Sequence, residues 1–349
     1  MLLSRVLISS FVILAAVFFS CTRTAPIYTT GGLTADGKYD SNFPLQPVSE
    51  DLERIARSVR LISSFTFYRT YVFNLNDAVT IEQINDPGFS LEKKASGETI
   101  SQKPGSGSAL VIYADRRKVL LLTCLHIVDE PDTAVNYYAD YESTKTRFIQ
   151  TVSIRVRTNI SIPSISSVDK IEVIAKDKKK DLALAAVKLS GADPFPEKVF
   201  NYRWGRAEEL EIGTFVYLLG FPNGKKMLST AVVSSPSRGD NHNFLVDAAL
   251  HRGISGGIIV ALRDGVPNFE LMGIVNAVSA QEANVLRPDP AVNPALMAKN
   301  QPYFGDIYVD KQLSVVYGIT YAVSIENIRD FIEDNRKLLA DNGFNLIIP

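Results

Sequence analysis

The sequence is poor in the residues that build disulfide scaffolds and metal sites. Its 349 residues include only two cysteines, Cys21 and Cys124, and only three histidines, His126, His242 and His251. So few cysteines exclude a disulfide-rich scaffold. No second ligand lies at a recognised metal-binding spacing from any of these residues, so we expect neither a metal nor another cofactor.

An excess of charge of either sign is also lacking. The chain has 37 lysines and arginines against 38 aspartates and glutamates, a formal net charge of −1. This balance gives no support to nucleic-acid binding, which a basic patch would favour. With 46% hydrophobic residues, the chain can bury a large core and is expected to form one compact unit.

The N-terminal apolar run, residues 6–19, is shorter than the roughly 20 residues that a spanning helix needs. It follows a short positive start, so we expect residues 1–20 to be a cleaved signal peptide. Cys21 directly after a small residue resembles a bacterial lipoprotein cleavage site, which implies a lipid anchor in the cell envelope. Simple secretion and an uncleaved anchor are the alternatives. A lipid on Cys21 leaves Cys124 without a disulfide partner, and we expect Cys124 to be a buried core residue.

Three short segments supply a base, a carboxylate and an alcohol. His126 ends the segment T-C-L-H, Asp181 heads D-L-A-L, and Ser255 is the centre of G-I-S-G-G. An imidazole can take the proton of a serine hydroxyl that attacks a carbonyl carbon, and a carboxylate can orient the imidazole. Backbone amides of Gly253 and Ser255 can hold the oxyanion that forms. The pattern predicts serine-nucleophile acyl transfer with the catalytic residues His126, Asp181 and Ser255.

Asp181 has two competitors nearby, Asp177 and Asp169. Asp181 is favoured because it alone heads an apolar run, which puts it at the rim of a buried strand. The other histidines, His242 and His251, are expected at the surface or at the edge of a pocket.

The three segments and several others resemble trypsin-fold serine proteases, most of all the bacterial HtrA/Deg branch. The similar motifs are G-S-G-x-x-V at residues 105–111, T-x-x-H at 123–126, D-L-A-L at 181–187, G-x-P-x-G at 220–224 and D-A-A at 247–250. Residues 273–276 and 318–323 resemble two later strands of the family. The order His, Asp, Ser is that of this fold. The resemblance implies an all-β fold of two six-stranded antiparallel β-barrels with a C-terminal helix, and endopeptidase activity.

The serine motif departs from the family at Ile254, where Asn or Asp is usual. In trypsin an aspartate there pairs with the N-terminus that activation frees, and isoleucine cannot form this ion pair. The geometry at Gly253 must therefore be held by packing or set by another event. The departure also favours an alternative, a pseudoprotease that binds peptides without cutting them. A further alternative is a surface-anchored lipoprotein that binds a partner through its insertions.

The resemblance also implies the substrate-binding residues. Ala249 and Leu250 fall at the floor of the specificity pocket, and Val278 falls at its mouth. No acid is present to receive Lys or Arg, so cleavage after small or medium apolar residues is expected. Asn276 is placed to hydrogen-bond the orienting carboxylate. The backbone of Asn276, Ala277 and Val278 is expected to pair with an extended substrate, which implies unfolded or loosely folded polypeptides as partners.

We expect a signal peptide at residues 1–20, a tether at 21–48 and a protease domain at 49–349. Within the protease domain, the first barrel is expected at about 60–200, the second barrel at about 205–323 and the closing helix at 324–342. Ser49 is predicted to cap an early helix and Ser324 the closing helix. The insertion 280–315 is either a lid or a surface elaboration. We do not expect the PDZ domain that many HtrA-type enzymes carry after this helix.

Overall fold

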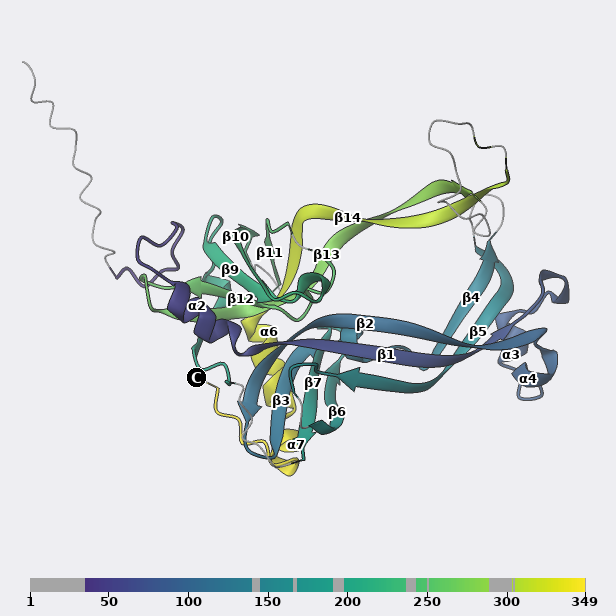
Figure 1. Ribbon diagram of the computed structural model, residues 1–349, viewed down its shortest axis with the longest axis horizontal. Coiled ribbons are helices and arrows are strands. Elements are labelled where there is room, and N and C mark those ends of the chain that lie inside the picture. The colour runs from purple at the N-terminus through teal and green to yellow at the C-terminus, as the bar shows by residue number, and fades with distance from the viewer. Residues whose placement is uncertain are drawn as a thin grey trace, which may run out of the picture. The chain divides into compact units, whose positions relative to one another are not determined.

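The computed structural model describes residues 35–348 apart from short gaps at 140–144, 166–167, 191–197, 237–242, 250, 289–302, 304 and some side chains next to them. The chain divides into two units, Met1–Asp36 and Gly37–Pro349. All described strands and helices belong to the second unit. They form two barrel-like sheets followed by C-terminal helices, which confirms the predicted fold class (Figure 1).

The first sheet has seven antiparallel strands in the order β4-β5-β1-β2-β3-β7-β6. Their bounds are β1 Val59–Val72, β2 Gly97–Ala114, β3 Lys118–Cys124, β4 Thr133–Ala139, β5 Lys145–Ser161, β6 Val168–Asp177 and β7 Leu182–Leu189. Strands β3 and β7 are almost wholly buried, as their continuous apolar runs require.

This first sheet is a half-barrel rather than the closed six-stranded barrel that was predicted. No pairing joins β4 to β6 among the described residues. Strands β1 and β2 pair along the whole length of β1, and β5 pairs with the C-terminal part of β1. Strands this long continue past the core as a ribbon (Figure 1), which carries the sheet away from closure.

The second sheet closes. Strands β12, β9, β10, β11, β14 and β13 follow one another, a further pairing joins β12 to β13, and the short β8 lies parallel to β13. The bounds are β8 Arg203–Trp204, β9 Phe215–Gly220, β10 Met227–Ser235, β11 Phe244–Val246, β12 Ile258–Leu262, β13 Phe269–Pro288 and β14 Ile307–Ser324. The described part of the predicted insertion 280–315 is a two-stranded extension of β13 and β14, paired as far as Pro288 and Ile307.

The closing helix begins as predicted. The Ser324 hydroxyl accepts a hydrogen bond from the Asn327 amide (3.4 Å), and the predicted apolar face is buried, at Ile325, Ile328, Phe331 and Ile332. The helix is not continuous, because Asn335 separates α6 (Ile325–Asp334) from α7 (Arg336–Asp341). The Asn335 side chain donates to the Phe331 carbonyl (2.7 Å), a local bond that competes with helix continuation.

The predicted cap at Ser49 is wrong. Helix α2 (Ser49–Ala56) has Val48 at its N-cap, without a side-chain cap, and Ser49 is already helical. The polar stretch between β1 and β2 contains short helices packed on a small second core around Phe73. The remaining short helices are η1 Leu75–Asp77, α3 Ile81–Ile84, α4 Leu91–Lys94, α5 Leu125–Val128, η2 Ala207–Glu209 and η3 Pro222–Gly224. Within the described ranges, no helix has the length and apolar character to cross a membrane.

Part of the expected tether is attached to the second sheet. Tyr39 is buried and forms an isolated β-bridge with Arg263. Its hydroxyl donates to Glu270 Oε2 (2.7 Å), and the Arg263 guanidinium lies 4.0 Å over its ring. Burial, with the neighbouring carboxylate, raises the pKa of Tyr39 well above its usual value. The compact unit therefore begins at Gly37 rather than after residue 48.

Replacing Tyr39 with phenylalanine is expected to lower the free energy of unfolding by about 2 kcal/mol, because a buried carboxylate loses a hydrogen-bond donor. The pKa of Tyr39 is higher in the folded chain than in the unfolded chain. The stabilisation by its hydroxyl is therefore present below about pH 10 and is lost as the pH rises above it. Urea unfolding at pH 7 and pH 11 measures both effects. The exposed Tyr321→Phe is the control; equal effects of the two variants at pH 7 would contradict the prediction.

Candidate active site

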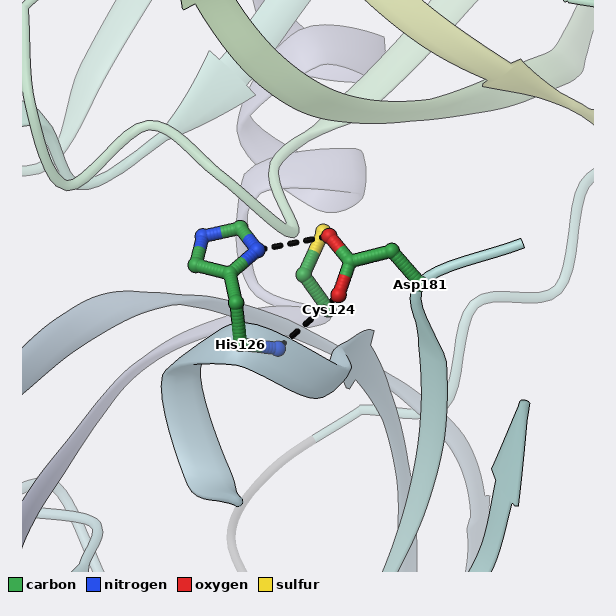
Figure 2. Close-up of side chains that lie close together, drawn as sticks. All are labelled: Cys124, His126 and Asp181. Atoms are coloured by element: carbon green, nitrogen blue, oxygen red, sulfur yellow. Dashed lines mark hydrogen bonds and ion pairs between the residues drawn. The ribbon is translucent and has the colours of Figure 1, made fainter. Parts of the chain in front are cut away.

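The structure brings His126 and Asp181 into direct contact. His126 lies in α5, the helical turn directly after β3, and Asp181 directly precedes β7. These two strands are paired neighbours, with Cys124 opposite Leu182, so the strand register places the two side chains together. The imidazole Nδ1 lies 2.6 Å from Asp181 Oδ2 (Figure 2). The His126 side chain is 49% exposed and that of Asp181 23%, so the pair is open to solvent on the histidine side.

Asp181 holds the histidine segment at three points. Besides the contact of Oδ2 with the ring, its Oδ1 accepts the His126 backbone amide (2.9 Å), and its carbonyl accepts the Leu125 amide (3.0 Å). Asp181 has a left-handed backbone conformation, with φ at +54°. This conformation is unfavourable for most side chains, and the three contacts offset its cost. The imidazole is thereby fixed with Nδ1 toward the carboxylate and Nε2 away from it.

The two alternative aspartates, Asp177 and Asp169, have different surroundings. Asp177 Oδ1 accepts the amides of Lys179 and Lys180 in the turn before β7, and Asp169 is exposed. Of the other histidines, His251 is exposed and His242 lies outside the described residues.

The Ser255 turn is fastened to the first sheet. The Ser255 carbonyl accepts the Ser108 amide of β2 (2.7 Å), and the Gly256 amide donates to the Val275 carbonyl (2.7 Å). Gly256 has a φ of +77°, and a Cβ there would collide with the Ser108 carbonyl, so only glycine fits. A Cβ on Gly107 would collide with Ile127 and lie 2.8 Å from the Ser255 carbonyl. The serine turn and the histidine helix thus both approach Gly107 closely.

Cys124 lies between the histidine–aspartate pair and the serine turn. Its sulfur and the ligand atoms of His126 and Asp181 lie within 4.8 Å of one another (Figure 2). The thiol donates to the Val275 carbonyl (3.3 Å) and is fully buried. Burial, together with the charge of Asp181, raises the pKa of the Cys124 thiol well above its usual value. A protonated thiol is neither a nucleophile nor a metal ligand, so Cys124 packs the space behind the site.

Ser255 itself is half-buried. Among the described residues, its hydroxyl makes no hydrogen bond with another side chain, and none with the His126 ring in particular. Such bonds are often long before substrate binds and shorten in the substrate complex.

The loop before Ser255, which is expected to bind the oxyanion, contacts the turn η3. The Arg252 carbonyl accepts the Asn223 amide (2.8 Å) and so faces the turn η3. The peptide bond to Gly253 is trans, so the Gly253 N–H points the opposite way from the Arg252 carbonyl, away from η3. Within the described chain, neither the Gly253 nor the Ser255 amide donates to a backbone carbonyl. Gly253 has a φ of +94°, and a Cβ there would lie 2.8 Å from the Phe221 carbonyl.

Ile254 anchors this loop in the core. The residue is only 2% exposed, and its Cδ1 reaches Gly220, where a Cβ would lie 2.6 Å away. Burial of an isoleucine side chain contributes roughly 1.5–3 kcal/mol. Apolar packing therefore occupies the position of the ion pair that a trypsin-type aspartate makes.

Ser108 is a site residue to which the sequence analysis gave no role. It is fully buried, its hydroxyl donates to the Gly253 carbonyl (3.2 Å), and the same oxygen accepts the Phe221 amide (2.8 Å). With its own amide on the Ser255 carbonyl, Ser108 joins the oxyanion loop, the nucleophile turn and η3. The signal available in the sequence was a serine directly before the apolar run 109–112 within β2.

The predicted substrate-binding residues are only partly described. Ala249 is exposed, Leu250 lies outside the described residues, and so do the side chains of Ala277 and Val278. Among the described residues, Asn276 makes no hydrogen bond to Asp181, contrary to expectation; the contacts of that carboxylate with His126 are made by Oδ1 to the backbone amide and by Oδ2 to the ring. The pairing of β13 with β14 is interrupted between Val275 and Ala277, and such a bulge re-aims the side chain it contains.

The family comparison decides the nature of the domain. Residues 107–267 match the family model described as the trypsin-like peptidase domain. The chain carries a trypsin-like peptidase domain. The match spans His126, Asp181 and Ser255, and it confirms the predicted trypsin-type serine peptidase fold. Cys21 lies outside the described residues, so the structure does not bear on the lipid anchor.

One solved structure similar to this chain is the serine endoprotease from Yersinia pestis. The two are 16% identical with a TM-score of 0.39, over 86% of this chain and 69% of that one. A likeness this distant adds nothing to the domain match. No curated protein matches the chain.

Replacing Ser108 with alanine is expected to slow acylation of the trypsin-like site about tenfold, because the Gly253 carbonyl and the Phe221 amide lose their shared partner and the oxyanion loop is held less firmly. The measurement is the rate of labelling by a serine-directed fluorophosphonate. Ser106→Ala, which removes an exposed hydroxyl two residues away, is the matched control. Equal rates for both variants would show that Ser108 does not position the loop.

Proposed function

We propose that the protein is a serine endopeptidase that hydrolyses polypeptides through His126, Asp181 and Ser255 by way of an acyl-enzyme. The observation that carries the proposal is the contact of 2.6 Å between His126 Nδ1 and Asp181 Oδ2 beside a glycine-lined serine turn. The orientation of the Gly253 amide supports the same reading.

In the proposed reaction, Ser255 Oγ attacks the scissile carbonyl carbon while His126 Nε2 takes the hydroxyl proton. The oxyanion of the tetrahedral intermediate accepts hydrogen bonds from the amides of Gly253 and Ser255. The C–N bond then breaks as His126 returns the proton to the leaving amine. Water repeats the sequence on the acyl-enzyme: His126 takes one proton from it, the ester bond breaks, and the proton returns to Ser255. Throughout, Asp181 steadies the charged imidazole.

Labelling with a fluorophosphonate tests the proposal directly. The wild-type chain is expected to form one covalent adduct, found on Ser255 by mass spectrometry, and Ser255→Ala is expected to form none. Ser106→Ala is expected to label as the wild type does, which controls for reaction with an exposed serine. A folded wild-type chain that forms no adduct would contradict the peptidase proposal.

A second candidate function is a pseudoprotease that binds peptides or a surface partner without cutting. The lack of a hydrogen bond from the Ser255 hydroxyl to His126 among the described residues favours it. Peptide binding that survives Ser255→Ala, combined with no turnover by the wild type, is the result that would favour this function over hydrolysis.

The proposed substrates are extended polypeptides cleaved after small or medium apolar residues. The pairing of β13 with β12 ends at Ile274, so among the described residues the backbone of Ala277 and Val278 pairs with β14 alone. An extended peptide can add a strand at such an edge. Cleavage of a peptide library is expected to favour Val, Ala, Ile or Leu before the cut, and dominance of basic or acidic residues there would overturn the specificity.

We also propose that the protein is exported in a bacterium and anchored in the cell envelope by a lipid on Cys21, with simple secretion as the alternative. The support is sequence alone: an apolar run followed by a small residue and cysteine. Metabolic labelling with a fatty acid is expected to mark the wild type but not Cys21→Ser, and an unmarked wild type would contradict lipidation.

A further inference from the structure

A cavity lies beside the turn η3, which contacts the oxyanion loop. Its volume is about 420 Å³, and its lining residues are Arg57, Arg60, Leu61, Pro163, Ser164, Phe221 and Lys226. Three of the seven carry a positive charge, and none of these described lining residues is acidic. We propose that this cavity binds a small oxyanion of the phosphate type, and that the bound anion stabilises the active arrangement of the oxyanion loop.

The cations are held in place before any anion arrives. The buried Arg60 guanidinium donates from its two terminal nitrogens to the carbonyls of Val59 and Arg57, each at 2.6 Å. Lys226 Nζ donates to the Ala56 carbonyl (3.0 Å). A binding site whose cations are already ordered loses little conformational entropy when the ligand binds. The arginine fork and the lysine ammonium together suit the several acceptor oxygens of a phosphate.

The electrostatics of the cavity also favour an anion. Burial lowers the pKa of Arg60 to about 10. The pKa of Lys226 is lowered by burial and then by the charges of Arg60 and Arg57. Arg57 has one acidic neighbour, Glu53, at 3.9 Å on the exposed side of its helix. An anion between the three cations would relieve their repulsion and replace lost hydration.

The cavity is connected to the catalytic loop through η3. Phe221 forms part of the wall, and Lys226 Nζ lies 5.6 Å from the centre of its ring. The Phe221 amide is bound by Ser108, and two residues later the Asn223 amide holds the Arg252 carbonyl, the contact that orients Gly253. An anion that fixes Lys226 and Phe221 therefore favours the turn geometry on which the oxyanion loop depends. This regulatory half of the inference rests on the proposed peptidase function.

The test for binding is titration calorimetry of the full chain with inorganic phosphate at low ionic strength. We expect saturable binding to the wild type and to Ser255→Ala, and about tenfold weaker binding to Lys226→Met, which loses one charge-assisted partner. Lys225→Met removes the adjacent exposed lysine, which does not line the cavity, and should bind as the wild type does. Arg57→Gln is a second, exposed variant expected to weaken binding. Comparing the affinities for glycerol 3-phosphate and for inorganic phosphate shows whether the cavity prefers a phosphate ester or the free ion.

The test for coupling is the rate of fluorophosphonate labelling with and without phosphate. We expect a severalfold acceleration in the wild type and in Lys225→Met, and little in Lys226→Met. Absence of saturable binding, or equal binding by Lys226→Met and Lys225→Met, would overturn the site. Binding without acceleration would overturn the coupling. A chain that binds phosphate as expected but never labels would instead overturn the peptidase function and leave the anion site standing.

Discussion

Replacing Ser255 or His126 with alanine is expected to lower the turnover of a peptide substrate by about a millionfold. Ser255→Ala removes the only atom that can form the acyl-enzyme. His126→Ala leaves the hydroxyl without a base, and a neutral serine is a poor nucleophile. The measurement is the steady-state rate of hydrolysis of a fluorogenic peptide, with the fold of each variant checked by thermal unfolding.

The two residues are expected to act as one unit, so the double variant should be about as slow as either single variant. If the two residues acted independently, the losses of turnover in the two single variants would multiply in the double variant. Ser106→Ala, an exposed serine on β2, is the control and should keep wild-type turnover. Undiminished hydrolysis by Ser255→Ala would end the assignment of the nucleophile, and multiplying losses would contradict the shared step.

The sequence predicted the parts of the site that depend on local patterns. His126 follows an apolar strand, Asp181 precedes another, and the neighbouring register of those strands brings the two side chains together. The glycines around Ser255 are required by positive φ values and close approaches, which makes them visible as a motif. The order of the segments then predicted the trypsin-like domain that the family match confirms.

The features that the sequence did not predict depend on contacts between distant residues. Ser108 is a site residue because the fold places the Gly253 carbonyl and the Phe221 amide, both from the second sheet, against its hydroxyl. Tyr39 stood in a polar, proline-containing stretch typical of a tether, and its burial depends on Glu270, more than two hundred residues away. No local propensity records such partners.

Strand length is the reason that the first sheet differs from the prediction. The β-branched and aromatic residues of 60–73 predict that β1 is a strand, but not that β2 continues to pair with it beyond the core. The same applies to β13 and β14, whose paired extension occupies part of the predicted insertion 280–315. Pairing partners, rather than residue preferences, determine where such strands end.

Replacing Asp181 with asparagine is expected to lower turnover by about ten-thousandfold while changing the melting temperature little. The aspartate has two acceptor oxygens, and each has a donor: Oδ1 accepts the His126 amide, and Oδ2 faces Nδ1. Asparagine has one acceptor oxygen. If that oxygen stays on the backbone amide, its NH₂ group points at Nδ1 and requires a lone pair there. The ring proton must then lie on Nε2, which can no longer take the proton of Ser255.

Asp169→Asn is the matched control, since it makes the same chemical change at an exposed aspartate nearby in the sequence. The wild type and Asp169→Asn should hydrolyse the peptide at equal rates. The tautomer is a separate readout, because nitrogen NMR of the imidazole should show the proton on Nδ1 in the wild type and on Nε2 in Asp181→Asn. Full activity of Asp181→Asn with the tautomer switched would show that His126 does not act as the base. If Asp181→Asn is slow but its tautomer is unchanged, the role of Asp181 is to stabilise the charged imidazole and not to orient the neutral one.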